Sequence, residues 1–157
     1  MSTELPKTYN PPANCLRDRV ILVTGAGSGI GRAAALSCAA HGATLILLGR
    51  TVDKLEAVYD EIENVGSPTP AIYPLCLEGA SEQDYQTLAE SIEKEFGQLH
   101  GLLHNASLLG QRTSMRAVAY PAEDPNTLLS PEQIMPAYLY LLGPGSQGIS
   151  GQSFDAQ

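Results

Sequence analysis

Val20-Ile-Leu-Val-Thr-Gly-Ala-Gly-Ser-Gly-Ile-Gly31 is the stretch that decides the fold. It joins a short apolar run to three spaced glycines, and an alanine-rich helical pattern follows from Arg32 to Ala40. This order predicts a strand, a tight turn and a helix. Gly25 permits a tight exit from the strand, Gly29 lets the backbone approach a pyrophosphate, and Gly31 lets the helix pack closely on the sheet. The first N–H groups of such a helix favour an anion at the turn.

The surrounding sequence supplies the context that this glycine motif needs. A second apolar strand, Thr44 to Leu48, follows Gly42, which suits a helix end. The spacing Thr-Gly-x-x-x-Gly-Ile-Gly resembles that of the short-chain dehydrogenase/reductase family. A second motif, His104-Asn105-Ala106-Ser107, follows an apolar strand and resembles the Asn-Asn-Ala-Gly that the family has at this position. The two motifs extend this resemblance over residues 18–110, and a glycine-rich loop without a ligand is the alternative interpretation.

The resemblance implies an α/β fold of three layers, with a Rossmann-type parallel sheet in the strand order 3-2-1-4. It also implies a nicotinamide cofactor at the carboxyl ends of the strands. The residues implied to bind this cofactor are Gly25, Ser28, Gly29, Ile30, Gly31, Asn105 and Ala106. Thr113 is a further candidate, because residues 113–117 resemble the family segment in which a threonine touches the nicotinamide carboxamide or the diphosphate.

The end of the second strand favours NADP over NAD. A dinucleotide-binding fold usually has a carboxylate there to bind the ribose 2′-hydroxyl, whereas this chain has Gly49 followed by Arg50. A carboxylate would repel a 2′-phosphate, and an arginine can hold it with a two-pronged, charge-assisted bond. The alternative is a surface arginine that only precedes the next helix. Cys76-Leu77 stands where the family has an aspartate that binds the adenine amino group.

Composition restricts the class of protein. The chain has 157 residues, 43% of them hydrophobic, which suits one domain with a single core. Its net charge is −8 without a Lys/Arg cluster, so we expect no nucleic-acid partner. No apolar run is long enough for a membrane span and residues 1–14 lack a signal-peptide core, so a cytoplasmic protein is expected. Cys15, Cys38 and Cys76 lack metal-ligand spacing, so we expect reduced thiols and no metal site.

Periodicity and capping residues predict the other elements. Residues 1–14, with three prolines, are expected to form a mobile arm before one Rossmann-type domain at 15–157. Further helices are predicted to begin at capping residues Thr51, Ser81 and Ser130, and strands are predicted at 71–77, 99–104 and 148–154. Pro74 lacks a backbone donor and therefore suits an edge strand.

One part of the family pattern has no counterpart in this chain. After the fourth strand, the family has a catalytic serine on a strand and Tyr-x-x-x-Lys on a long helix. None of the three lysines here has a tyrosine four residues before it. The chemistry needs that pair, because the tyrosine hydroxyl moves the proton while hydride is transferred. We therefore expect a seam near residues 110–114, with roughly 90 residues missing if a single-domain oxidoreductase has about 250.

Two functions remain open from the sequence. The first is an NADP-dependent oxidoreductase that transfers hydride between the nicotinamide and a small-molecule carbonyl or alcohol, once the missing segment is supplied. The second is a catalytically inactive nucleotide-binding or structural remnant. In the 157-residue chain the fourth strand has no fifth strand beside it, so we expect an exposed apolar edge and a homo-oligomer.

Overall fold

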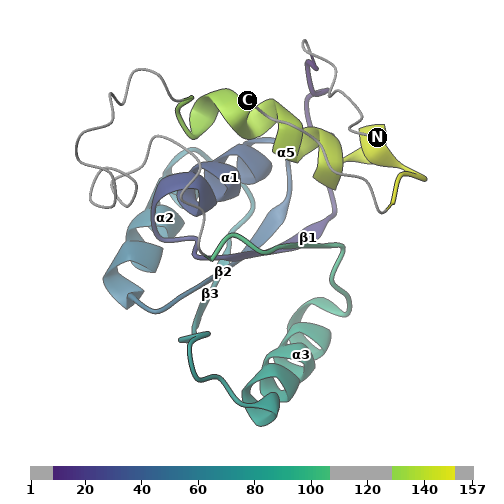
Figure 1. Ribbon diagram of the computed structural model, residues 1–157. Coiled ribbons are helices and arrows are strands. Elements are labelled where there is room, and N and C mark those ends of the chain that lie inside the picture. The colour runs from purple at the N-terminus through teal and green to yellow at the C-terminus, as the bar shows by residue number, and fades with distance from the viewer. Residues whose placement is uncertain (1–8, 107–128, 151–157) are drawn as a thin grey trace.

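The computed structural model describes residues 9–106 and 129–150. Within these ranges a parallel sheet lies between two layers of helices (Figure 1). The elements are β1 Val20–Thr24, α1 Gly29–Ala40, β2 Thr44–Gly49, α2 Val52–Asn64, β3 Ala71–Pro74, α3 Glu82–Phe96, β4 Gly101–Leu103, the 3₁₀ turn η2 Glu132–Ile134, α5 Met135–Leu142 and the 3₁₀ turn η3 Pro144–Ser146. Helices α1, α2 and α5 cover one face of the sheet, and α3 covers the other.

The strand order is β3-β2-β1-β4, and every pairing is parallel, as the sequence predicts. Val20 pairs with Thr44 and Thr24 with Leu48, so β1 and β2 begin and end together. Because parallel strands end at the same edge of a sheet, the loops after β1, β2 and β4 meet there.

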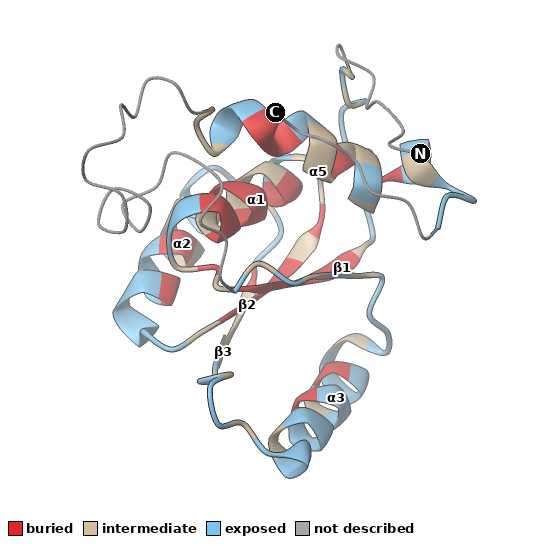
Figure 2. Cartoon of the chain, viewed as in Figure 1, coloured by how far each residue is buried: buried red, intermediate tan, exposed pale blue. Residues whose placement is uncertain are grey.

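The central strands are buried on both faces (Figure 2). Ile21 and Val23 belong to the core under α1, α2 and α5, whereas Val20 and Leu22 belong to the core under α3. This alternation is the two-residue period of a strand, and residues of β2 divide between the two cores in the same way. A third apolar cluster joins α1 to α5 through Ile30, Ala33, Ala34, Ile134 and Met135.

The outer strands are shorter than predicted. β3 ends at Pro74, on the sheet edge where proline is tolerated. β4 covers only Gly101–Leu103. At each of its ends, a side chain takes the place of a backbone group as the hydrogen-bond partner of a backbone N–H. The Val20 N–H donates to Nδ1 of His100 at 2.9 Å, and the Asn105 N–H donates to Oγ1 of Thr24 at 2.9 Å.

The helical segments begin at the predicted residues Thr51, Ser81 and Ser130, and two of these side chains form capping hydrogen bonds. Ser81 and Asp84 form a capping box, whose hydrogen bonds from the Ser81 hydroxyl and N–H hold the pKa of Asp84 below its usual value. Ser130 and Gln133 form the same kind of box, with a 2.7 Å bond from the Ser130 N–H to Gln133 Oε1. α2 also begins directly after Thr51, as predicted, but the Thr51 hydroxyl makes no capping hydrogen bond.

Several predictions lie wholly or partly outside the described residues. These are residues 1–8 of the N-terminal arm, the seam at 110–114, Thr113 and residues 151–154 of the last strand. Tyr9, within the expected arm, packs edge-on against Tyr140 with ring centroids 5.2 Å apart. Residues 148–150 are not part of a strand.

None of the helices in the described ranges is long and apolar enough to cross a membrane. The described histidines, cysteines and acidic residues form no group of three or more that could hold a metal ion. All three cysteines are free. Burial, with a smaller effect from Cys15, raises the pKa of Cys38 to about 12, so this thiol stays protonated and is not a nucleophile at neutral pH.

Candidate nucleotide-binding site

The loop between β1 and α1 lies at the carboxyl edge of the sheet and is built on left-handed glycines. Gly25 has a φ of +66° and Gly29 a φ of +55°, a region that residues with a β-carbon rarely adopt. α1 begins at Gly29, three residues earlier than predicted, so the loop passes directly into the first turn. The first N–H groups of that turn have no partner within the helix and are available to an anion.

Gly31 lies where the segments of the site pack most closely against one another. A β-carbon there would collide with the Gly25 carbonyl oxygen and would lie 2.5 Å from Nδ2 of Asn105. The loop therefore folds back onto the first turn of α1, with the end of β4 against it. Only glycine fits between these three segments.

Thr24 and Asn105 join the ends of β1 and β4. Oγ1 of Thr24 donates to the Leu103 carbonyl oxygen at 3.3 Å and accepts the Asn105 N–H at 2.9 Å. Nδ2 of Asn105 donates to the Gly25 carbonyl oxygen at 3.5 Å. Oδ1 of Asn105 is buried and has no hydrogen-bond partner within the described part of the chain. The site thus holds an unused acceptor directly beside the glycine loop.

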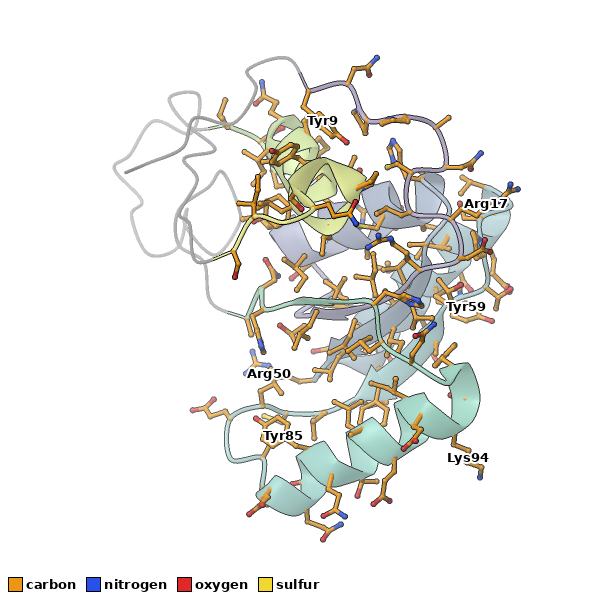
Figure 3. All side chains as sticks on the ribbon, turned by 90° about the vertical axis from the view of Figure 1, so that its right-hand side faces the viewer. Tyr9, Arg17, Arg50, Tyr59, Tyr85 and Lys94 are labelled. Carbon is orange, nitrogen blue, oxygen red and sulfur yellow. The ribbon has the colours of Figure 1, made fainter. Side chains whose placement is uncertain are left out.

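The end of β2 lies next to this loop. The Ala26 N–H donates to the Leu48 carbonyl oxygen at 3.1 Å, which ties the loop to β2. Gly49 and Arg50 follow, and Arg50 is exposed (Figure 3). Arg32, in the first turn of α1, is already engaged, because its Nε donates to Oε1 of Glu61 at 3.2 Å and the two side chains form a salt bridge.

The structure brings most of the predicted site residues together. Gly25, Ser28, Gly29, Ile30, Gly31, Asn105 and Ala106 lie at the junction of β1, α1 and β4, and Arg50 lies at the end of neighbouring β2. Ile30 is buried in the cluster between α1 and α5, so only its backbone faces the loop. Thr24 is a further residue of the site, and a hydroxyl that ends a buried apolar strand is the sequence signal for such a polar contact.

The comparisons with known proteins agree with this geometry. A family model described as short chain dehydrogenase matches residues 19–123. The uncharacterized oxidoreductase YciK of Escherichia coli (strain K12) is 30% identical over 241 aligned positions, which cover 95% of this chain and 96% of the relative. The short chain dehydrogenase structure from Shigella flexneri has a TM-score of 0.91 and 29% identity, with 96% of this chain and 95% of that chain covered.

A structure from Escherichia coli CFT073, complexed with NADPH, has a TM-score of 0.87 and 30% identity, with 93% of this chain and all of that chain covered. The fold defines an α/β protein with a Rossmann-type parallel sheet. The chain belongs to the short-chain dehydrogenase family of oxidoreductases.

An internal segment of these relatives has no counterpart here. The 241 positions aligned with YciK exceed the 157 residues of this chain by 84, and the alignment reaches nearly both ends of both proteins. Other relatives are matched over a smaller share. The chain spans 39% of the short chain dehydrogenase mpl6 of Monascus purpureus and 38% of the levodione reductase of Leifsonia aquatica.

Proposed function

We propose that this chain binds NADP(H) at the glycine loop and that its ancestral reaction is hydride transfer between the nicotinamide and a small-molecule carbonyl or alcohol. The observation that carries the proposal is the close packing of Gly25, Gly31 and Asn105, which leaves bare backbone where a pyrophosphate would lie. Gly25, Ser28, Gly29, Ile30 and Gly31 would hold the diphosphate, and Asn105 and Ala106 would lie beside the ribose. Thr113 stays a candidate from the sequence alone.

Two features support NADP(H) over NAD(H). Gly49 offers no carboxylate to a ribose 2′-hydroxyl, and a β-carbon there would lie 3.2 Å from Cδ2 of Leu55, which disfavours an acidic side chain at this position. Arg50 is exposed, and no described residue forms a hydrogen bond or salt bridge with it. An unpaired guanidinium at this strand end suits a 2′-phosphate. The NADPH complex of the E. coli CFT073 relative gives further support.

Removing the Arg50 guanidinium tests the cofactor preference. We expect Arg50→Ala to weaken NADPH binding by about 10-fold to 100-fold, because a hydrogen-bonded charge pair contributes about 1.5–3 kcal/mol. NADH binding should change less than twofold. Calorimetric titration of both nucleotides measures the difference. Arg17→Ala is the matched control, because Arg17 is exposed before β1, at the opposite edge of the sheet (Figure 3). An equal loss for both nucleotides would contradict the assignment.

Turnover is the part of the function that these 157 residues lack. The serine strand and the Tyr-x-x-x-Lys helix of the family are absent from the sequence, so binding without catalysis is the function that this polypeptide supports. The second candidate is a full oxidoreductase, in which the internal segment found in YciK is present in the natural protein. An intact mass of the natural protein, compared with its gene, distinguishes the two. A cytoplasmic location fits both.

The free edge of β4 supports self-association. β4 is the last strand of the described sheet, and Leu102 on it is 45% exposed. An open apolar edge favours pairing with another chain. We expect light scattering to give a mass above that of the monomer at high protein concentration, and Leu102→Lys to shift the mass towards the monomer. A clean monomer for the unsubstituted chain would contradict this prediction.

A further inference from the structure

Lys54, in the first turn of α2, lies directly against the glycine loop. A β-carbon built on Gly27 would be 2.9 Å from Cβ of Lys54 and 3.6 Å from its carbonyl carbon. Gly27 therefore has to be glycine for this turn of α2 to approach so closely. The contact places the base of a lysine side chain beside the loop that is proposed to hold the cofactor phosphates.

The first turn of α2 is held firmly in this position. Leu55 is 1% exposed, and its Cδ2 contacts both glycine positions, at 3.6 Å from a β-carbon on Gly27 and 3.2 Å from one on Gly49. Further along, the salt bridge between Arg32 and Glu61 joins α1 to α2. The start of Lys54's side chain is thus fixed relative to both the loop and the end of β2.

Lys54 and Arg50 are the available cations at this corner of the described structure. Arg32 is occupied by Glu61, and the loop itself, residues 25–31, contains no basic residue. Lys54 and Arg50 are both exposed, and neither has a hydrogen-bond or salt-bridge partner among the side chains that the structure describes. Between them, the Thr51 hydroxyl makes no cap, and the N–H groups of Val52 and Asp53 have no hydrogen-bond partner among the described residues.

From this placement we propose that Lys54 is a second cation of the 2′-phosphate subsite and a determinant of the preference for NADP(H). The proposal rests on the proposed function. A phosphate monoester carries close to two negative charges at neutral pH, and Arg50 supplies one positive charge. Lys54 supplies the other, on a flexible stem whose base is anchored at Gly27. Asp53 lies in the same turn and opposes the phosphate by its charge.

The test compares NADPH and NADH binding by calorimetry in four variants. Lys54→Met keeps the aliphatic stem and removes the charge, and we expect it to weaken NADPH binding about threefold to tenfold and NADH binding less than twofold. Lys54→Arg should retain NADPH binding within about twofold. Asp53→Asn should strengthen NADPH binding, since it removes the opposing charge. Lys94→Met is the control, because Lys94 is exposed at the end of α3, on the other face of the sheet (Figure 3).

The outcomes separate the two proposals. If the preference of the wild type for NADPH is lost in Arg50→Ala but unchanged in Lys54→Met, the role of Lys54 is overturned. The proposed function would then still stand. Equal weakening of NADPH and NADH in Lys54→Met would also overturn it, as a general effect on the loop. Failure of the wild type to bind either nucleotide would overturn both. The affinities for adenosine 2′,5′-bisphosphate and adenosine 5′-monophosphate give a second comparison. In Lys54→Met, only the affinity for adenosine 2′,5′-bisphosphate should fall.

Discussion

Replacing Gly31 by alanine is expected to destabilise the protein by about 3 kcal/mol and to weaken NADPH binding more than tenfold. The added methyl group would collide with the Gly25 carbonyl oxygen and would lie 2.5 Å from Asn105 Nδ2 and 2.8 Å from the Gly25 carbonyl carbon. Two of these three atoms are backbone atoms of the loop, so no side-chain rotation relieves the clash. The loop has to move away from α1, which removes both the packing and the phosphate site.

Chemical denaturation and an NADPH titration measure the two effects of Gly31→Ala. Gly66→Ala is a suitable control, because Gly66 has a φ of +73° and no atom within 4 Å of its built β-carbon. That variant carries backbone strain without a clash, so we expect a cost of about 1 kcal/mol and unchanged NADPH binding. Inside an ordinary helix, alanine is more stabilising than glycine by about 1 kcal/mol. A Gly31→Ala protein that is more stable than the wild type would therefore show that the close approach is absent.

The 157-residue chain is expected to show no ketone-dependent oxidation of NADPH above the uncatalysed background. A positioned proton donor contributes roughly 10²-fold to 10⁴-fold to such a reaction, and Tyr-x-x-x-Lys is absent from every part of the sequence. Cys38 is not a substitute, because the thiol is buried and its pKa is raised to about 12. A nucleotide bound as proposed would therefore lack the proton donor that reduction of a carbonyl requires.

A panel of ketones and aldehydes, followed by NADPH absorbance, tests this expectation. Gly29→Asp is the control, because it places a carboxylate and a β-carbon at a residue with a φ of +55° in the proposed anion site. Turnover that depends on a ketone and disappears in Gly29→Asp would refute the prediction of inactivity. Turnover that persists in the control would arise from another protein in the preparation.

The sequence was sufficient to predict the order of elements from β1 to β4. The glycine motif and the apolar runs indicated the strands, and the family resemblance that they carry implied the order 3-2-1-4, which the structure has. These features are local, since each depends on a few neighbouring residues and on the general rules for parallel sheets. The same reasoning placed Pro74 on an edge strand and predicted Ser81 and Ser130 as capping residues.

Contacts between distant segments could not be predicted in this way. The lengths of β3 and β4 were overestimated, because apolar composition does not show that His100 and Thr24 replace backbone partners at the two ends of β4. The approach of Lys54 to Gly27 joins the first turn of α2 to the loop before α1 and has no local signal. The packing of α5 on α1 likewise depends on a segment far along the chain.

The docking of α5 on α1 has a consequence for synthesis on the ribosome. α1 is complete at Ala40, yet the side chains that cover Ile30, Ala33 and Ala34 come from Ile134 and Met135. A ribosome needs about 5–20 s to add the intervening residues. Throughout that time the apolar face of α1 lies open on the nascent chain. Chaperones that bind such faces therefore have a defined target on α1. This target is accessible until α5 emerges and covers it.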